Sequence, residues 1–278
     1  MPDTHGGNIF KFSHDHKINL SEVTDFSANI NLLGPSPKGL EALNERLRYI
    51  SHYPDVTNDD VMNTIADVYG IEKDSILLGN GAAELIYAVG RLSGFTGAFV
   101  PAPGFSEYQA SMDAANIPVR EIFYRQRQND DGTPYFEVPY LALQTFAAEL
   151  KGQDGRIIVF LGNPNNPDGT LLDKQSIKVL AQMLKDANSL LVIDESFIDF
   201  IGDESLRDNS HSMRELINQY DNVIIVHSFT KFYAVPGLRI GAVFANPTLI
   251  QELRQYIPAW SVNTLAQAYT ESALTDTK

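Results

Sequence analysis

The segment that decides the fold reads Val223-Ile-Ile-Val-His-Ser-Phe-Thr-Lys-Phe-Tyr-Ala-Val-Pro-Gly-Leu-Arg-Ile-Gly241. It opens with an apolar run at 223–226, which predicts a buried strand. A Pro-Gly pair at 236–237 predicts a turn, and a second apolar run follows at 240–244. The polar residues of the segment therefore lie at the junction between two buried strands.

Three polar side chains at this junction, Ser228, Lys231 and Arg239, indicate a particular chemistry. Burial lowers the pKa of an amine, and a neutral amine can form a Schiff base with an aldehyde. A hydroxyl and a guanidinium can together hold a phosphate. A ligand that carries both an aldehyde and a phosphate is pyridoxal phosphate. The alternative is that Lys231 extends its amine into solvent and Arg239 forms a surface ion pair.

Length and composition limit the other functions. The chain has 278 residues, 44% of them hydrophobic, which is enough for a sizeable core. Its formal charge of -14 argues against nucleic-acid or membrane-surface binding, because both need basic patches. We expect no transmembrane run and no secretion signal. The absence of Cys excludes disulfides, thiolate metal sites and a Cys nucleophile, and it fits a cytoplasmic protein. We also expect no metal centre.

Segments with strand patterns alternate with segments that have helix patterns. The predicted strands are 75–78, 98–103, 156–161, 189–195, 223–226 and 240–244, and the predicted helices are 37–50, 58–70, 85–92, 139–151 and 173–186. Residues 1–35 are expected to be irregular. This alternation predicts an α/β fold in which helices cover both faces of a mostly parallel sheet. Ligands bind such sheets beyond the carboxyl ends of the strands.

Several other polar or glycine-rich segments follow predicted strands. Gly79-Asn-Gly-Ala-Ala-Glu84 stands between a strand and a helix, where free backbone N–H groups can bind phosphate, although a plain tight turn fits equally well. Asp194 ends an apolar run, where a buried carboxylate needs a partner. That partner is either a protonated pyridine nitrogen or an arginine, unless Asp194 caps a turn. Phe105 or Tyr108 could stack on a flat ring, or pack in the core. Asn166, Asp194, Ser228 and Lys231 all follow the carboxyl ends of predicted strands. We therefore expect these side chains to lie on one rim of the same sheet.

These segments together resemble the fold type I pyridoxal-phosphate (PLP) enzymes of the aspartate aminotransferase superfamily. The motifs that carry the resemblance are Asn163-Pro-Asn-Asn-Pro-Asp-Gly169, Asp194-Glu-Ser-Phe197, Ser228-Phe-Thr-Lys231 and Gly237-Leu-Arg239. The resemblance extends from His5 to about Leu274. It implies a PLP-dependent transferase-like large domain, with most of the C-terminal small domain missing.

The resemblance implies roles around the cofactor ring. Lys231 would carry the cofactor as a Schiff base and later move protons at the substrate Cα. Asp194 would pair with the pyridine nitrogen and keep it protonated, so that the ring acts as an electron sink. Asn166 would hydrogen-bond the phenolic oxygen, and Phe105 would stack on the ring.

It also implies a phosphate site and a partner subunit. Ser228, Arg239 and the backbone of Gly81 and Ala82 would hold the cofactor phosphate. Tyr53 matches a tyrosine that reaches the cofactor phosphate of the other subunit in relatives, which implies a homodimer.

Within the superfamily, the threonine-phosphate decarboxylases of cobalamin biosynthesis match best, and histidinol-phosphate aminotransferases match next. The additional matching segments are His5-Gly-Gly-Asn8, Asp25-Phe-Ser-Ala-Asn-Ile-Asn31, Gly79–Glu84, Asp194–Phe200 and Trp260-Ser-Val-Asn263. Phe197 stands where aminotransferase relatives usually have Tyr, whose hydroxyl bonds the ring's phenolic oxygen. This difference favours the decarboxylase.

The expected reaction is decarboxylation of O-phospho-L-threonine to aminopropanol phosphate. His5 and Asn31 are the candidates for binding the substrate phosphate. One alternative is an aminotransferase acting on histidinol phosphate or a similar amine, and another is a non-catalytic PLP-binding fragment. The expected organisation is an N-terminal arm with part of the small domain at 1–50, the PLP-binding large domain at 51–246, and a connecting helix with the start of a truncated small domain at 247–278.

Overall fold

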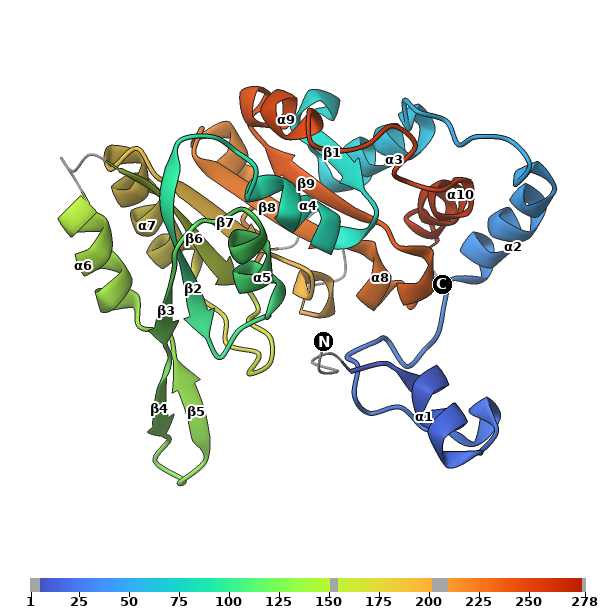
Figure 1. Cartoon of the computed structure of the whole chain (residues 1–278), viewed down its shortest axis with the longest axis horizontal. Helices are drawn as coiled ribbons and strands as arrows, with labels where there is room; N and C mark the ends of the chain where they lie inside the picture. Colours follow the sequence, from blue (N-terminus) through green and yellow to red (C-terminus); the bar gives the residue numbers. More distant parts are fainter. Residues whose placement is uncertain (1–5, 151–154, 202–209, 277–278) are drawn as a thin grey trace.

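A seven-stranded sheet forms the centre of the protein, shown in Figure 1 as a computed structural model that describes residues 6–150, 155–201 and 210–276. The sheet has the strand order β1-β9-β8-β7-β6-β2-β3. Its strands are β1 (Ile76–Gly79), β2 (Phe95–Ala102), β3 (Val119–Phe123), β6 (Arg156–Gly162), β7 (Leu190–Asp194), β8 (Val223–Ser228) and β9 (Gly241–Ala245). Only β9 runs antiparallel to its neighbours, β1 and β8. The prediction of a mostly parallel sheet is confirmed.

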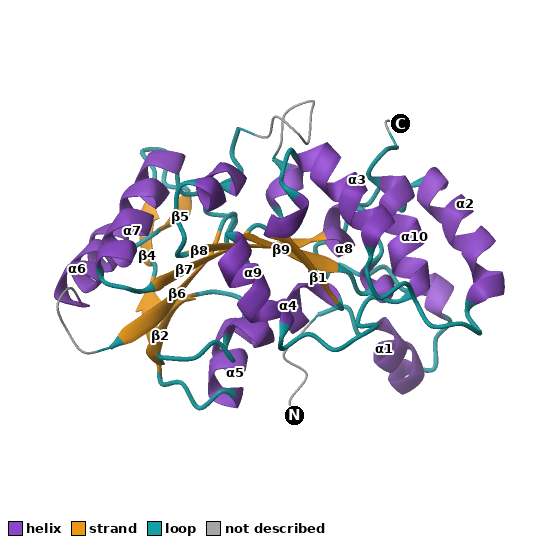
Figure 2. Ribbon diagram, turned by 90° about the horizontal axis from the view of Figure 1, so that it is seen from above, coloured by secondary structure: helices purple, strands orange, loops and turns teal. Residues whose placement is uncertain are grey.

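Helices cover both faces of this sheet (Figure 2). One face carries α3 (Asp59–Tyr69), α6 (Tyr140–Leu150), α7 (Lys174–Asp186) and α10 (Thr264–Ala273). The other face carries α4 (Gly81–Val89), α5 (Glu107–Ala114) and α9 (Pro247–Arg254). The predicted core helices and strands are therefore all present, because their apolar periodicities match the faces that they bury.

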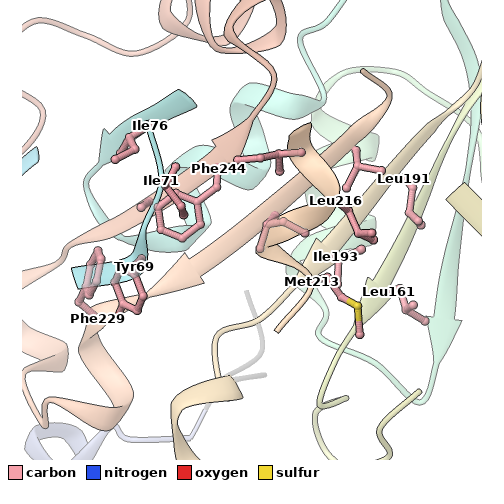
Figure 3. Packing of buried hydrophobic residues seen from close by; sticks show 14 of the residues in the cluster. Tyr69, Ile71, Ile76, Leu161, Leu191, Ile193, Met213, Leu216, Phe229 and Phe244 are labelled. Atoms are coloured by element: carbon pink, nitrogen blue, oxygen red, sulfur yellow. The ribbon is translucent and has the colours of Figure 1, made fainter. Parts of the chain in front are cut away.

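The two faces of the sheet have separate hydrophobic cores, because successive strand residues point to opposite sides. On β8, Val223 and Ile225 enter one core, and Ile224 and Val226 enter the other. Figure 3 shows part of the first core, where Phe244 lies among side chains from the strands and the segments that pack on them. This alternation also decides on which face each polar residue at a strand end emerges.

Some segments lie outside this sandwich. The hairpin of β4 (Arg125–Gln128) and β5 (Pro134–Glu137) projects from the sheet in Figure 1. The expectation that 1–35 is irregular was wrong for 9–16, which form α1 (Ile9–His16) with no buried residue. The Asn8 side chain caps this helix by accepting a hydrogen bond from the Lys11 N–H, a local signal that the glycines before it obscured.

The predicted helix at 37–50 is shorter than expected. It comprises α2 (Pro37–Arg46), and a single 3₁₀ turn at Leu47–Tyr49 follows. Helix α2 packs against α10. Among the described residues, no helix is long and apolar enough to cross a membrane.

Candidate active site

Two parallel strands end at the same edge of the sheet and bring two of the predicted polar residues together. Asp194 is the last residue of β7, and Ser228 is the last residue of β8. Asp194 pairs in register with Val226, so the two polar residues lie on adjacent strands near the same rim. Both share the face of the apolar residues Val192 and Val226, since they stand an even number of positions away.

Asp194 is held by two hydrogen bonds at this rim. The residue is only 6% exposed. The Tyr108 hydroxyl donates to Oδ2 at 2.8 Å, and the Ser196 N–H donates to Oδ1 at 2.9 Å. Burial, together with the Asp194 charge, raises the pKa of Tyr108 well above its usual value, so Tyr108 stays a hydrogen-bond donor. The pair fixes the direction of the Asp194 carboxylate.

Lys231 lies in the short helix α8 (Phe229–Phe232), which directly follows β8. Its side chain is half-buried, and burial lowers the pKa of its amine. The nearby Arg239 guanidinium lowers this pKa further, whereas the Asp194 carboxylate acts in the opposite direction. The structure therefore brings Lys231, Arg239 and Asp194 into one electrostatic cluster, with an amine more easily deprotonated than an exposed lysine.

The start of α4 brings backbone N–H groups close to the Arg239 guanidinium. Gly81 has φ +80°, and a Cβ atom built there would collide with the Arg239 guanidinium. A Cβ atom on Gly241 would likewise lie 2.6 Å from the Ala82 backbone nitrogen. The Asn80 side chain does not cap α4, so it does not occupy the first N–H groups of this helix, and another acceptor can bind them. Backbone donors and a guanidinium thus meet where glycine alone leaves room.

Two loops carry the remaining predicted ring contacts. The Asn165 side-chain amide donates to the Pro103 carbonyl at 3.0 Å and ties the loop after β6 to the loop after β2. Phe105 follows in the second loop, and its ring meets the Tyr108 ring edge-to-face with centroids 5.7 Å apart. Asn166 is half-buried in the first loop. Both residues therefore belong to the same rim as Asp194.

The other predicted site residues have different surroundings. Asn31 is half-buried, and its backbone N–H donates to the Lys231 carbonyl at 3.1 Å, so it lies beside the lysine. Tyr53 is 79% exposed and stacks on Trp260, with ring centroids 4.6 Å apart. It borders a cavity of about 310 Å³ between α2, α3 and α10. His5 lies outside the described residues.

Sequence reasoning missed a second polar cluster on the opposite face of the sheet. His227 and Asp199 form a buried pair, with Nε2 3.2 Å from Oδ2 and side-chain exposures of 1% and 3%. The Tyr69 hydroxyl lies 3.3 Å from the same His227 nitrogen. Glu195 is also fully buried and accepts a hydrogen bond from the Ser212 hydroxyl at 2.6 Å. The one available signal was the polar His227 within an apolar strand.

The residues on the rim fit pyridoxal 5'-phosphate. A desolvated lysine amine suits an aldehyde, and a buried carboxylate suits a protonated pyridine nitrogen. Arg239 and the start of α4 suit a phosphate. The fold and this donor set define a PLP-dependent enzyme with the large-domain architecture of the aminotransferases.

Comparison with known proteins gives the family. Residues 21–278 match the family Aminotransferase class I and II, and the chain belongs to it. It is 36% identical to the adenosylcobalamin biosynthesis bifunctional protein CobDQ of Leptospira interrogans over 98% of this chain and 29% of that protein. It is 32% identical to the threonine-phosphate decarboxylase of Salmonella typhimurium over 98% of this chain and 70% of that enzyme.

A solved structure supports the same assignment. The histidinol-phosphate aminotransferase from Clostridium acetobutylicum superposes with a TM-score of 0.77 at 26% identity, over 92% of this chain and 70% of that one. The chain thus spans 70% or less of the length of these three relatives. Family and site together indicate PLP as the cofactor.

Proposed function

We propose that the protein decarboxylates O-phospho-L-threonine, releasing CO2 and forming aminopropanol phosphate. The observation that carries the choice of decarboxylation is Phe197, three residues after Asp194. Its half-buried ring tilts against Phe200, with centroids 6.2 Å apart, and it offers no hydroxyl to the cofactor's phenolic oxygen. The similarity to a threonine-phosphate decarboxylase supports the choice of substrate.

PLP supplies an electron sink for the pair left at Cα when a bond to Cα breaks. In the proposed reaction the bond between Cα and the carboxylate breaks, and a proton replaces CO2 at Cα. The Asp194 carboxylate, which Tyr108 and Ser196 orient, would hold the pyridine nitrogen in its protonated form. The lowered pKa of Lys231 would favour the neutral amine that can hold the cofactor aldehyde, and the same amine would move the proton at Cα.

The phosphate of the cofactor is proposed to bind at Ser228, Arg239 and the backbone of Gly81 and Ala82. Phe105 is proposed to stack on the ring, and Asn166 to bond its phenolic oxygen. The Ser228 hydroxyl lies 2.8 Å from the Thr230 hydroxyl, which orients it within this group.

The substrate phosphate is proposed to bind near His5 and Asn31. The Asn31 side chain already donates to the Phe232 carbonyl at 2.8 Å and accepts from the Leu33 N–H at 3.0 Å. One amide hydrogen of Asn31 remains for a substrate oxygen, because a primary amide has two.

A homodimer in the cytoplasm is proposed as the functional state. Tyr53 exposes 79% of its surface, and Leu32 and Leu33 each expose 94%. Such apolar exposure favours association with another copy. Light scattering at high concentration tests this proposal, and a clean monomer would contradict it.

The test of function has two stages. The chain is first mixed with PLP, reduced with borohydride and mapped by peptide mass, with Lys231→Ala as the control. We expect dominant labelling of Lys231, and labelling scattered over surface lysines would overturn the cofactor site. O-Phospho-L-threonine is then supplied, and CO2 and aminopropanol phosphate are measured.

The second candidate is amino transfer from histidinol phosphate or a similar amine. The superposition with a histidinol-phosphate aminotransferase favours it. Amino transfer to a keto acid without release of CO2 from phosphothreonine would establish this alternative. If Lys231 is labelled and neither reaction occurs, the chain is a PLP-binding protein without turnover, and the proposed decarboxylation is wrong.

A further inference from the structure

The backbone of the lysine helix is held from outside by two distant segments. Helix α8 has only four residues, so its carbonyl groups have few partners within the helix. Three successive carbonyls, those of Lys231, Phe232 and Tyr233, accept hydrogen bonds from Asn31 or Tyr269. These donors come from the N-terminal arm and from α10, more than 30 residues away along the chain in each case.

Asn31 contributes two of the three bonds. Its backbone N–H donates to the Lys231 carbonyl at 3.1 Å, and its side-chain amide donates to the Phe232 carbonyl at 2.8 Å. The Leu33 N–H donates to the Asn31 side-chain oxygen at 3.0 Å and holds the amide in this orientation. Asn31 thus acts on the lysine residue itself and on the residue that follows it.

Tyr269 contributes the third bond from a fully buried position. Its hydroxyl donates to the Tyr233 carbonyl at 2.8 Å and accepts from the Ser36 N–H at 2.8 Å. Its ring lies against Gly39 of α2, where an added Cβ atom would come within 2.6 Å of the ring. Helix α2 fixes the Tyr269 ring, and the Ser36 N–H fixes its hydroxyl. The Tyr233 carbonyl therefore accepts its hydrogen bond from a donor that is held in place.

We propose that Tyr269 and Asn31 are positioning residues for Lys231, which fix the backbone of its helix and so keep its amine directed at Asp194 and Arg239. Neither needs to touch the cofactor to do this. Loss of a side-chain bond takes the donor described above from the Phe232 or the Tyr233 carbonyl and lets α8 shift, which exposes the amine to water. The proposal rests on the proposed use of Lys231 as the cofactor lysine.

The test compares Tyr269→Phe and Asn31→Ala with Tyr233→Phe. The first removes a hydroxyl and keeps the ring against Gly39. The second removes the hydrogen bond from the Asn31 side-chain amide to the Phe232 carbonyl. The control removes a neighbouring buried hydroxyl that makes none of the three bonds. In the cofactor-free chain, acetic anhydride acetylation of Lys231 is followed against pH by peptide mass, with exposed Lys17 as an internal reference.

For both variants we expect the midpoint of Lys231 acetylation to move to higher pH, because a more hydrated amine keeps its proton longer. We also expect the dissociation constant of PLP to rise about threefold to tenfold, as for the loss of one buried hydrogen bond. Tyr233→Phe should change neither quantity. A urea midpoint that falls while the acetylation midpoint stays fixed would assign the two residues a purely structural role and overturn the proposal.

The two proposals fail in different ways. If the wild-type chain forms no borohydride-stable adduct at Lys231, the proposed function fails, and the acetylation midpoint still decides the positioning role. If the wild type is labelled and both variants match it in midpoint and affinity, the positioning role alone is wrong. If Tyr269→Phe does not fold, Asn31→Ala decides the question in the same assay, because Asn31 is only half-buried.

Discussion

Replacing Gly81 with Ala should weaken cofactor binding strongly, with only a moderate loss of stability. The Cβ atom of the new residue would occupy the space of the Arg239 guanidinium, which must move away from the start of α4. A guanidinium that holds a phosphate contributes about 1.5–3 kcal/mol through charge-assisted hydrogen bonds. Its displacement should therefore raise the dissociation constant of PLP roughly 10- to 150-fold.

Backbone strain has to be separated from this effect, because Gly81 has φ +80°. Gly132→Ala is the matched control, since Gly132 has φ +84° and an added Cβ atom there meets nothing within 4 Å. Each substitution should lower the free energy of unfolding by about 1–2 kcal/mol. Only Gly81→Ala should weaken PLP binding, measured by absorbance titration, and both variants should unfold at similar urea concentrations. Wild-type affinity in Gly81→Ala, or equal weakening in both variants, would refute the reasoning.

Three further outcomes follow from buried groups. Tyr108→Phe should lower the free energy of unfolding by about 1–3 kcal/mol, because it leaves the Asp194 carboxylate short of a donor. It should also weaken PLP binding. Urea titration measures the first effect, and absorbance titration with PLP measures the second. Asp199→Asn should destabilise the chain by a similar amount by breaking the His227 pair, and a changed PLP affinity there would contradict the separation of the two faces. The folded-state pKa of Lys231 lies below its unfolded value near 10.5, so the folded chain binds fewer protons between these values. Stability should consequently rise with pH across that window, and the rise should vanish in Lys231→Ala when urea midpoints are compared.

The sequence predicted the sheet and the rim because both depend on local patterns. Apolar runs such as 223–226 bury a strand whatever surrounds them, and Asp194 and Ser228 necessarily end at the same edge once their strands run parallel. The motif around Lys231 likewise lies within a single stretch of chain. These features need only the order of residues and the geometry of a parallel sheet.

The hydrogen bonds that hold the site could not be predicted in this way. Tyr108 was expected to stack on a ring or pack in the core, and its bond to Asp194 depends on how α5 lies on the sheet. The short α1 was missed because its only clear signal is the Asn8 cap. The roles of all the predicted site residues, and the domain boundaries, stay predictions.

The sequence by itself determined the fold class and the places of Lys231 and Asp194 at the ends of their strands, since each is encoded within a few neighbouring residues. Only the tertiary structure decided that the Arg239 guanidinium lies against Gly81 and that Tyr269 holds the carbonyl of Tyr233. These contacts join residues more than 30 positions apart, and they form only where helix packing brings the donor within about 3 Å of its acceptor. Such distances are set by the packing of whole helices and not by local propensity.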